Sequence, residues 1–259
     1  MNNYEKDYSA LLIDVLENGE KTESRNSIVF KKTACQLRVD LSEGLPVVTG
    51  KKIFPRSSFV EIEWLLSGDT NTKFLNDNGV KIWDQWSNKN GDLGPVYGKQ
   101  LVDFNGVNQL KELMNQLKTD PMSRRHLVSM WNPSELSEMA LPPCHYSFQI
   151  VSYSSKLDLV VSMRSLDLFI GLPYDMLMYS VILSAICKEL NKIPGEVIIN
   201  AADCHVYEEH IESAMVYAER KKYELPKLLK VPIFSKFNFK EVEISDYKTN
   251  PRLKVNVLK

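Results

Sequence analysis

The chain has 259 residues and a formal net charge of -1, with 44% apolar and 25% charged residues. This composition is typical of an ordinary globular protein, and it excludes the global positive charge that would attract nucleic acid or an anionic membrane. Apolar runs such as LDLVVSM are far shorter than the roughly 20 residues that span a bilayer. The N-terminus lacks the apolar segment of a signal peptide, so we expect a cytoplasmic protein, and its length suits one large domain or two modest ones.

The first half of the chain predicts three helices and a strand region. Residues 8–21 have apolar side chains at helical spacing and predict a helix. Residues 26–41 alternate in polarity and are rich in β-branched side chains, which predicts paired strands. Residues 59–68 predict a helix that ends at a glycine, and residues 106–121 predict an amphipathic helix that ends at a proline.

The second half predicts most of the sheet. Three strands are predicted, at residues 126–131, 146–155 and 157–165. Residues 176–192 are apolar on nearly every face, which predicts a buried helix. Residues 196–221 predict a strand that runs into a helix, and residues 231–248 predict a strand pair. Because strands and helices mix without a regular βαβ rhythm, we expect an α+β fold on a largely mixed sheet.

The cysteines favour reduced thiols over a disulfide or zinc framework. They show no CxxC pairing or regular spacing, and lie at Cys35, Cys144, Cys187 and Cys204. His205 and His210 could suggest a metal site, but no third ligand of suitable spacing is evident, so we expect no metal.

Cys144 follows two prolines in the stretch ALPPCH and precedes a predicted strand. Prolines restrict the path of the chain, which is one way to hold a nucleophile in position. A buried, inert cysteine is the commoner alternative, and this stretch alone does not decide between the two.

Arginines beside hydroxyl side chains are typical of a site for a phosphate dianion. Such stretches contain Arg25, Arg124, Arg125 and Arg164, the last beside Ser165. Each arginine alone could equally be a solvated surface residue.

Three further features leave two interpretations open. His205 and Tyr207 share one face if they lie on a strand, either as ligand-binding residues or as a core histidine packed on a tyrosine. One of Glu61 and Glu63 is expected to face inward, where a glutamate needs hydrogen bonds or a function. Trp83 could stack on a flat ligand or fill the core.

Read as one set, these stretches resemble thymidylate synthase. The motifs are colinear over almost the whole chain: GLPVVTGKK, WLLSGDTN, IWDQW, NGDLGPVYGKQ, DPMSRRH, ALPPCH, RSLDLFIGLPY, DCHVYEEH and NPRLK. The resemblance implies a single catalytic domain over residues 1–259 with a thymidylate synthase-like α+β fold. In this fold a mixed sheet is packed with helices and joins two chains into a homodimer. It also implies one-carbon transfer from the co-substrate 5,10-methylenetetrahydrofolate to C5 of a pyrimidine nucleoside 5'-monophosphate.

The resemblance assigns a role to each candidate. Cys144 is implied to add to C6 of the pyrimidine, Glu61 to organise water and protons, and Tyr97 to assist proton removal from C5. The implied nucleotide site comprises Arg25, Arg164, Ser165, Asp167, His205 and Tyr207, with Arg124 and Arg125 from the other subunit. The implied folate site comprises Lys51, Ile82, Trp83, Asp167, Ile170 and Tyr174. The arginines are expected to lower the pKa of the Cys144 thiol.

The main departure from the family lies at Asp175. The family's motif normally continues Pro-Phe-Asn, whereas this chain has Pro173, Tyr174 and Asp175. The asparagine accepts from N3–H of uracil and donates to O4, and cytosine presents the reverse edge. A carboxylate accepts from N4–H₂ and shares a proton with N3, so Asp175 predicts cytosine and a role in ring protonation. A neutral drift from asparagine in a loop of an ordinary synthase is the alternative.

Two further features bear on the product. The chain reads MRS at Met163, where synthases read QRS, and in this and in Asp175 it is similar to deoxycytidylate hydroxymethylase. Trp83 and the C-terminal LKVNVLK favour a closable site that could transfer hydride and give a methyl product, although Lys259 replaces a small apolar residue.

The leading hypothesis is a dCMP or CMP hydroxymethylase. The alternatives are a thymidylate synthase that methylates dUMP, a dCMP or CMP methyltransferase, and a catalytically silent nucleotide- or RNA-binding homologue. Cys144 and Glu61 disfavour the last, because a binding module needs no thiol.

Overall fold

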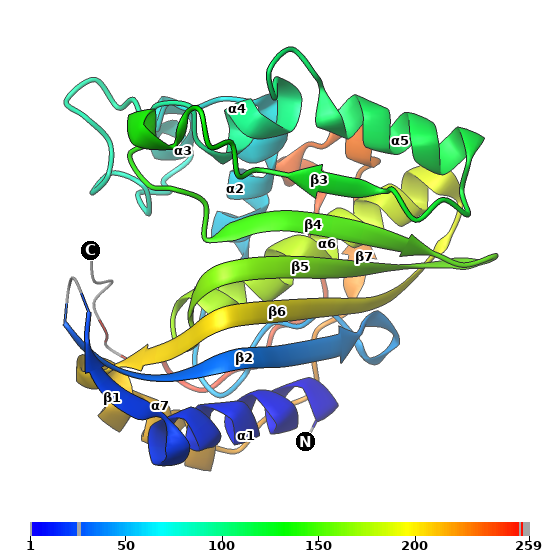
Figure 1. Cartoon of the computed structure of the whole chain (residues 1–259). Helices are drawn as coiled ribbons and strands as arrows, with labels where there is room; N and C mark the ends of the chain where they lie inside the picture. The colour runs from blue at the N-terminus through cyan, green and yellow to red at the C-terminus, as the bar shows by residue number, and fades with distance from the viewer. Residues whose placement is uncertain (1, 25–26, 254, 256–259) are drawn as a thin grey trace.

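A six-stranded sheet forms the centre of the computed structural model, which describes residues 2–24, 27–253 and 255. Its strands, in spatial order, are β1 (Glu20–Glu23), β2 (Ile28–Asp40), β6 (Ile193–Tyr207), β5 (Lys156–Asp167), β4 (His145–Ser152) and β3 (Leu127–Ser129). The β5–β6 pair is parallel and the other pairs are antiparallel. The predicted α+β class with a mixed sheet is confirmed (Figure 1).

Helices cover one face of the sheet. The central one, α6 (Gly171–Leu190), packs against β5 and β6 on one side and against α2 (Pro55–Ser67) on the other. It lies behind β4 and β5 in Figure 1. This position between two layers explains why α6 is apolar all round. The other helices are α1 (Asn3–Asn18), α3 (Lys73–Asp77), α4 (Tyr97–Val102), α5 (Gln109–Thr119) and α7 (Ile211–Glu219).

The two faces of the sheet differ in chemistry. One row of register neighbours faces the helices and is buried: Phe148, Val161, Ile199 and Leu37. The next residues along each strand point the opposite way. They form a polar row that no helix buries: Ser147, Ser162, Asn200 and Gln36.

The prediction of paired strands at residues 26–41 is wrong. This stretch forms the single long strand β2, in which Ala34 has a φ of 59°. No glycine, proline or asparagine lies between Lys31 and Gln36, so the stretch lacks the residues of a hairpin turn.

The predicted strand pair at residues 231–248 is also largely wrong. Only β8 (Glu243–Ile244) is a strand there, and it pairs with β7 (Leu228–Lys230) outside the predicted range. The rest contains 3₁₀ turns whose aromatic side chains pack on the helices, with the Phe239 N–H donating to Glu63 Oε2 (2.8 Å). The alternating apolar side chains of residues 231–248 are therefore explained by 3₁₀ turns that pack on the helices. Within the described ranges, no helix is long and apolar enough to cross a membrane.

Candidate active site

Cys144 lies immediately before β4, at the predicted loop-to-strand junction, and Arg164 on β5 fixes its loop. The Arg164 guanidinium donates from Nε to the Pro143 carbonyl (2.9 Å) and from Nη2 to the Pro142 carbonyl (2.8 Å). Its Nη2 also lies 3.8 Å from Cys144 Sγ. One arginine thus holds the backbone and the thiol of the same loop.

Burial raises the pKa of the Cys144 thiol, while Arg164 opposes this rise and Asp175 adds to it. The expectation that arginines lower this pKa is confirmed in direction for Arg164, but desolvation outweighs this contribution in the single chain and the net shift is upward. The positive charges of Arg124 and Arg125 do not contribute, since both side chains are exposed on a distant loop.

A buried polar chain leads from Cys144 into the core. The Cys144 backbone N–H donates to the Tyr97 hydroxyl (2.7 Å), and the Tyr97 ring packs on His145 with centroids 4.4 Å apart. His145 Nδ1 lies 2.6 Å from the Tyr179 hydroxyl, and burial lowers the His145 pKa to about 3. The histidine is therefore neutral at physiological pH. Sequence analysis did not assign His145 or Tyr179, although the position of His145 beside Cys144 was an available signal.

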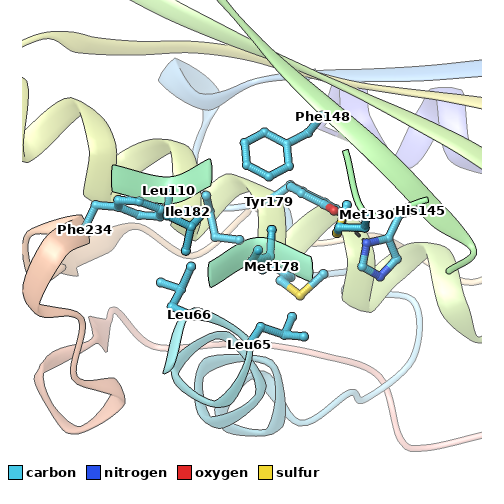
Figure 2. Close-up of a pocket in the computed structure, with 11 residues that line it drawn as sticks. Leu65, Leu66, Leu110, Met130, His145, Phe148, Met178, Tyr179, Ile182 and Phe234 are labelled. Carbon is cyan, nitrogen blue, oxygen red and sulfur yellow. Dashed lines mark hydrogen bonds between the residues drawn. The ribbon is translucent and has the colours of Figure 1, made fainter. Parts of the chain in front are cut away.

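A small apolar cavity adjoins this chain (Figure 2). Its volume is about 10 Å³, and its walls include Leu110, Met130 and Ile182, with Tyr179 turned toward His145 at one side. A cavity this small has room for about one water, and apolar walls offer that water few partners. It is a packing gap beneath the site.

Glu61 on α2 accepts a hydrogen bond from Trp83 Nε1 (2.8 Å). Burial raises the pKa of Glu61 to about 7, and the indole N–H partly opposes this rise. The Trp83 ring is only 8% exposed and packs against Trp64, Trp86 and Tyr97. Trp83 therefore fills the core and also orients Glu61.

Asp175 lies in the second turn of α6 and not in a loop. Its side chain is half-buried, and burial raises its pKa well above the ordinary range, with the nearby charges of Glu61 and Asp167 adding to the rise. Burial and both neighbouring charges therefore act in the same direction and favour the protonated form of Asp175.

Asp167 ends β5 and shapes the turn into α6. Its Oδ1 accepts from the backbone N–H groups of Phe169 (3.0 Å) and Ile170 (2.9 Å). In the β5–β6 register it pairs with His205, whose Nδ1 lies 2.8 Å from Asp203 Oδ1.

His205 and Tyr207 lie on β6 as predicted, with ring centroids 5.2 Å apart. Ser165 on β5 pairs in register with Asp203, so it lies beside the same end of β6. The structure therefore brings these residues to the strand ends next to Asp167.

Three of the predicted folate residues are at least partly exposed. Ile82 is 44% exposed, and Ile170 and Tyr174 are half-buried at the start of α6. Their role in binding folate stays a prediction. Lys51 points inward instead, with Nζ donating to the Phe169 carbonyl, and burial lowers its pKa to about 7. An anionic folate tail fits Lys51 only if this side chain turns outward.

The remaining predicted arginines do not reach Cys144 within one chain. Arg124 and Arg125 are exposed in the loop before β3, and the neighbouring His126 carbonyl accepts from Ile150 N–H (2.9 Å). Ile150 lies six residues beyond Cys144 on the extended β4 segment, or roughly 20 Å. Arg25 and Lys259 lie outside the described residues.

Comparison with known proteins places this site in a family. Residues 6–259 match the thymidylate synthase family. The chain belongs to the thymidylate synthase family. It is 38% identical over 283 residues to the thymidylate synthase of Mycoplasma mobile, an alignment that covers 96% of this chain and 98% of that protein. It is 39% identical over 261 residues to the thymidylate synthase of Coxiella burnetii strain Dugway 5J108-111, with 97% and 99% covered.

Membership of the thymidylate synthase family makes the protein a one-carbon transferase that uses 5,10-methylenetetrahydrofolate as co-substrate. Among the described residues, no cluster of His, Cys, Asp or Glu could hold a metal ion. These relatives are named thymidylate synthase, so their names give no support to the cytidylate branch that Asp175 suggests.

Proposed function

We propose that this enzyme transfers a one-carbon unit to C5 of a cytosine nucleoside 5'-monophosphate, with dCMP favoured over CMP. The observation that carries the proposal is Asp175, half-buried in the second turn of α6, where burial and the charges of Glu61 and Asp167 raise its pKa. An asparagine there would read uracil, and an aspartic acid has different hydrogen-bonding capacity.

A neutral Asp175 matches the edge of cytosine. Its O–H donates to N3 while its carbonyl oxygen accepts from N4–H₂. In the opposite orientation, the same neutral acid could accept from N3–H of uracil and donate to O4. Discrimination therefore arises when the Asp175 proton passes to N3. Cytosine N3 can take this proton, which leaves a carboxylate paired with N3–H and N4–H₂, whereas uracil N3 already carries a proton and uracil O4 would face a repelling carboxylate.

The proposed role of Asp175 includes proton transfer. When the Cys144 thiolate adds to C6, the C5–C6 π electrons form a C4–C5 double bond, the C4–N3 π electrons pass to N3, and N3 takes the Asp175 proton. Glu61, whose pKa is raised to about 7, can hold or release a proton near neutrality, and we assign it the handling of water and protons. The folate co-substrate supplies the one-carbon unit at the level of formaldehyde. Tyr97 is proposed to assist the loss of the C5 proton.

The phosphate site is proposed to be shared between two subunits. Arg164, Ser165 and Arg25 would come from one chain, and Arg124 and Arg125 from its partner. The separation of roughly 20 Å between the two regions of one chain supports this division. The polar sheet face that no helix buries supports a homodimer that joins through the sheet.

We propose hydroxymethyl as the product, on the similarity of Met163 and Asp175 to deoxycytidylate hydroxymethylase. A dCMP or CMP methyltransferase differs only in how the C5 methylene is resolved. Production of dihydrofolate would identify hydride transfer and a methyl product, whereas its absence would identify attack by water.

A second candidate is methylation of dUMP, which is favoured by the names of the relatives. The raised pKa of Asp175 makes this candidate chemically acceptable, because the neutral acid can also pair with uracil.

The test is Asp175→Asn, assayed with dCMP and dUMP against the wild type. The proposal predicts that the substitution raises the ratio of kcat/KM for dUMP to kcat/KM for dCMP by about 100-fold or more. An unchanged ratio would show that Asp175 does not read the base.

A further inference from the structure

We infer that His126 is a positioning residue that fixes the loop carrying Arg124 and Arg125, and through it the phosphate site of the partner subunit. The inference rests on the proposed function, because it takes these two arginines to bind nucleotide phosphate across a dimer interface.

The loop in question connects α5 to β3. Arg124 and Arg125 are both exposed, and neither guanidinium makes an ion pair within the part of the chain that the structure describes. Figure 1 shows the connection at the right-hand edge of the sheet, whereas β4 begins at the left. These cations are therefore available to a ligand that the same chain does not supply.

His126 connects the two ends of this loop through a hydrogen bond. Its side chain is fully buried, and Nε2 lies 3.1 Å from the Asp120 carbonyl oxygen. A carbonyl only accepts, so Nε2 carries the proton and donates. The same carbonyl accepts from Ser123 N–H (3.1 Å). The first residue of the loop is thereby tied to the residue that follows the arginines.

The bond from Nε2 is the one hydrogen bond that the His126 ring makes among the described residues. Nδ1 of His126 is buried and has no hydrogen-bond partner among residues 2–24, 27–253 and 255. An unpaired buried nitrogen is unfavourable, and an aliphatic side chain of similar volume would avoid it. The compensating feature is the Nε2–H bond that orders the loop.

Other hydrogen bonds also hold this loop, including one within it from Arg125 N–H to Ser123 Oγ (3.3 Å). Gln149 Nε2 donates to the Arg124 carbonyl (3.1 Å), and Ile150 N–H donates to the His126 carbonyl (2.9 Å), both from β4. Without the imidazole, Asp120 would keep its bond from Ser123 but lose its tie to the start of β3. Guanidinium groups bind phosphate through a fixed fork, so a small displacement weakens binding.

The first test uses His126→Leu, which lacks the donor, and His126→Gln, whose side-chain amide can replace it. With the nucleotide that the wild type converts fastest, His126→Leu is expected to raise the nucleotide KM about ten-fold and to change kcat by less than about three-fold. His126→Gln should recover most of the loss. Equal KM values for His126→Leu and wild type would overturn the inference. Should His126→Leu not fold, His126→Met supplies a longer side chain without a donor.

The second test uses heterodimers purified with two different affinity tags. A Cys144→Ala, His126→Leu chain paired with a wild-type chain has one live site, whose arginines come from the substituted chain, so its KM should be raised. A Cys144→Ala chain paired with a His126→Leu chain should have the wild-type KM. The reverse pattern would show that His126 acts within its own chain, and would overturn the inference.

Arg125→Ala in the same pairings separates this inference from the proposed function. If Arg125→Ala raises KM only through the partner and His126→Leu does not, the inference alone fails. If Arg125→Ala changes KM in neither pairing, the shared phosphate site itself is wrong, and the inference falls with it.

Discussion

The guanidinium of Arg164 lies 3.8 Å from Cys144 Sγ while it donates to the carbonyls of Pro142 (2.8 Å) and Pro143 (2.9 Å). One side chain thus couples the position of the nucleophile to its ionisation. Burial still raises the thiol pKa in the single chain, and the charge of Arg164 makes this rise smaller.

Replacing Arg164 should make Cys144 less reactive. Loss of the guanidinium raises the thiol pKa further, because Arg164 is the group that most opposes desolvation. We expect Arg164→Ala to slow iodoacetamide alkylation of Cys144 at pH 8 by about ten-fold. The matched control is Cys187, which is buried away from Arg164 and should react slowly in both proteins. Equal alkylation rates of Cys144 in the wild type and in Arg164→Ala would contradict the electrostatic interaction between Arg164 and the thiol.

Glu61 should make stability depend on pH. Its pKa rises from 4.5 to about 7 in the folded state, so the folded protein holds a proton that the unfolded chain has released between these values. Stability from this group is therefore present below pH 4.5 and is lost as pH rises through 7. Glu61→Gln, which stays neutral, should be about 1–3 kcal/mol more stable than wild type at pH 8 and equal to it at pH 4.5. Urea unfolding at fixed protein concentration measures both. A gain of the same size at the two pH values would exclude this cause.

Tyr179→Phe should destabilise the protein without altering its fold. The substitution leaves His145 Nδ1 buried and without its 2.6 Å partner. An unsatisfied buried polar atom costs about 1–3 kcal/mol, which urea unfolding would detect. Tyr146→Phe on the same strand as His145 is the control, because Tyr146 is 36% exposed. A Tyr179→Phe protein as stable as that control would argue against the hydrogen bond.

Glu5 should be the most sensitive position on α1. Its buried carboxylate accepts hydrogen bonds from Thr49 N–H (2.8 Å), Gly50 N–H (2.9 Å) and the Tyr217 hydroxyl (2.6 Å). Thr49 and Gly50 directly precede Lys51 in the chain. Glu5→Ala leaves these donors unpaired and should lower the free energy of unfolding by about 2–4 kcal/mol. Glu17→Ala, on the same helix but exposed, should change it by less than about 0.5 kcal/mol. Similar values for the two would refute the role of Glu5.

Periodicity in the sequence was sufficient for most of the fold. It predicted α5, α6 and the strands around Cys144, because apolar residues in these elements recur with the clear 3.6-residue period of a helix or the 2-residue period of a strand. It failed at β2 and at residues 231–248, where the pattern could not show which partner a segment packs against. The Phe239 turn is apolar because it docks on α2, and this contact is set by the tertiary structure.

The candidate site residues could be proposed from the sequence, but their geometry could not. Motif resemblance proposed Cys144, Glu61 and Asp175, whereas the inward turn of Lys51 depends on the Phe169 carbonyl across the fold. The raised pKa of Asp175 likewise depends on its burial and on the charges of Glu61, which is distant in sequence, and of Asp167 at the end of β5. The direction of this shift could not be predicted from the sequence.

The most direct measurement is an incubation of the purified enzyme with 5,10-methylenetetrahydrofolate and dCMP, CMP, dUMP or UMP in turn. Mass spectrometry identifies the nucleotide product, and absorbance follows dihydrofolate. We predict hydroxymethylated dCMP, or CMP, without dihydrofolate. Methylated dUMP with dihydrofolate, and no cytosine product, would contradict the central claim that Asp175 selects cytosine.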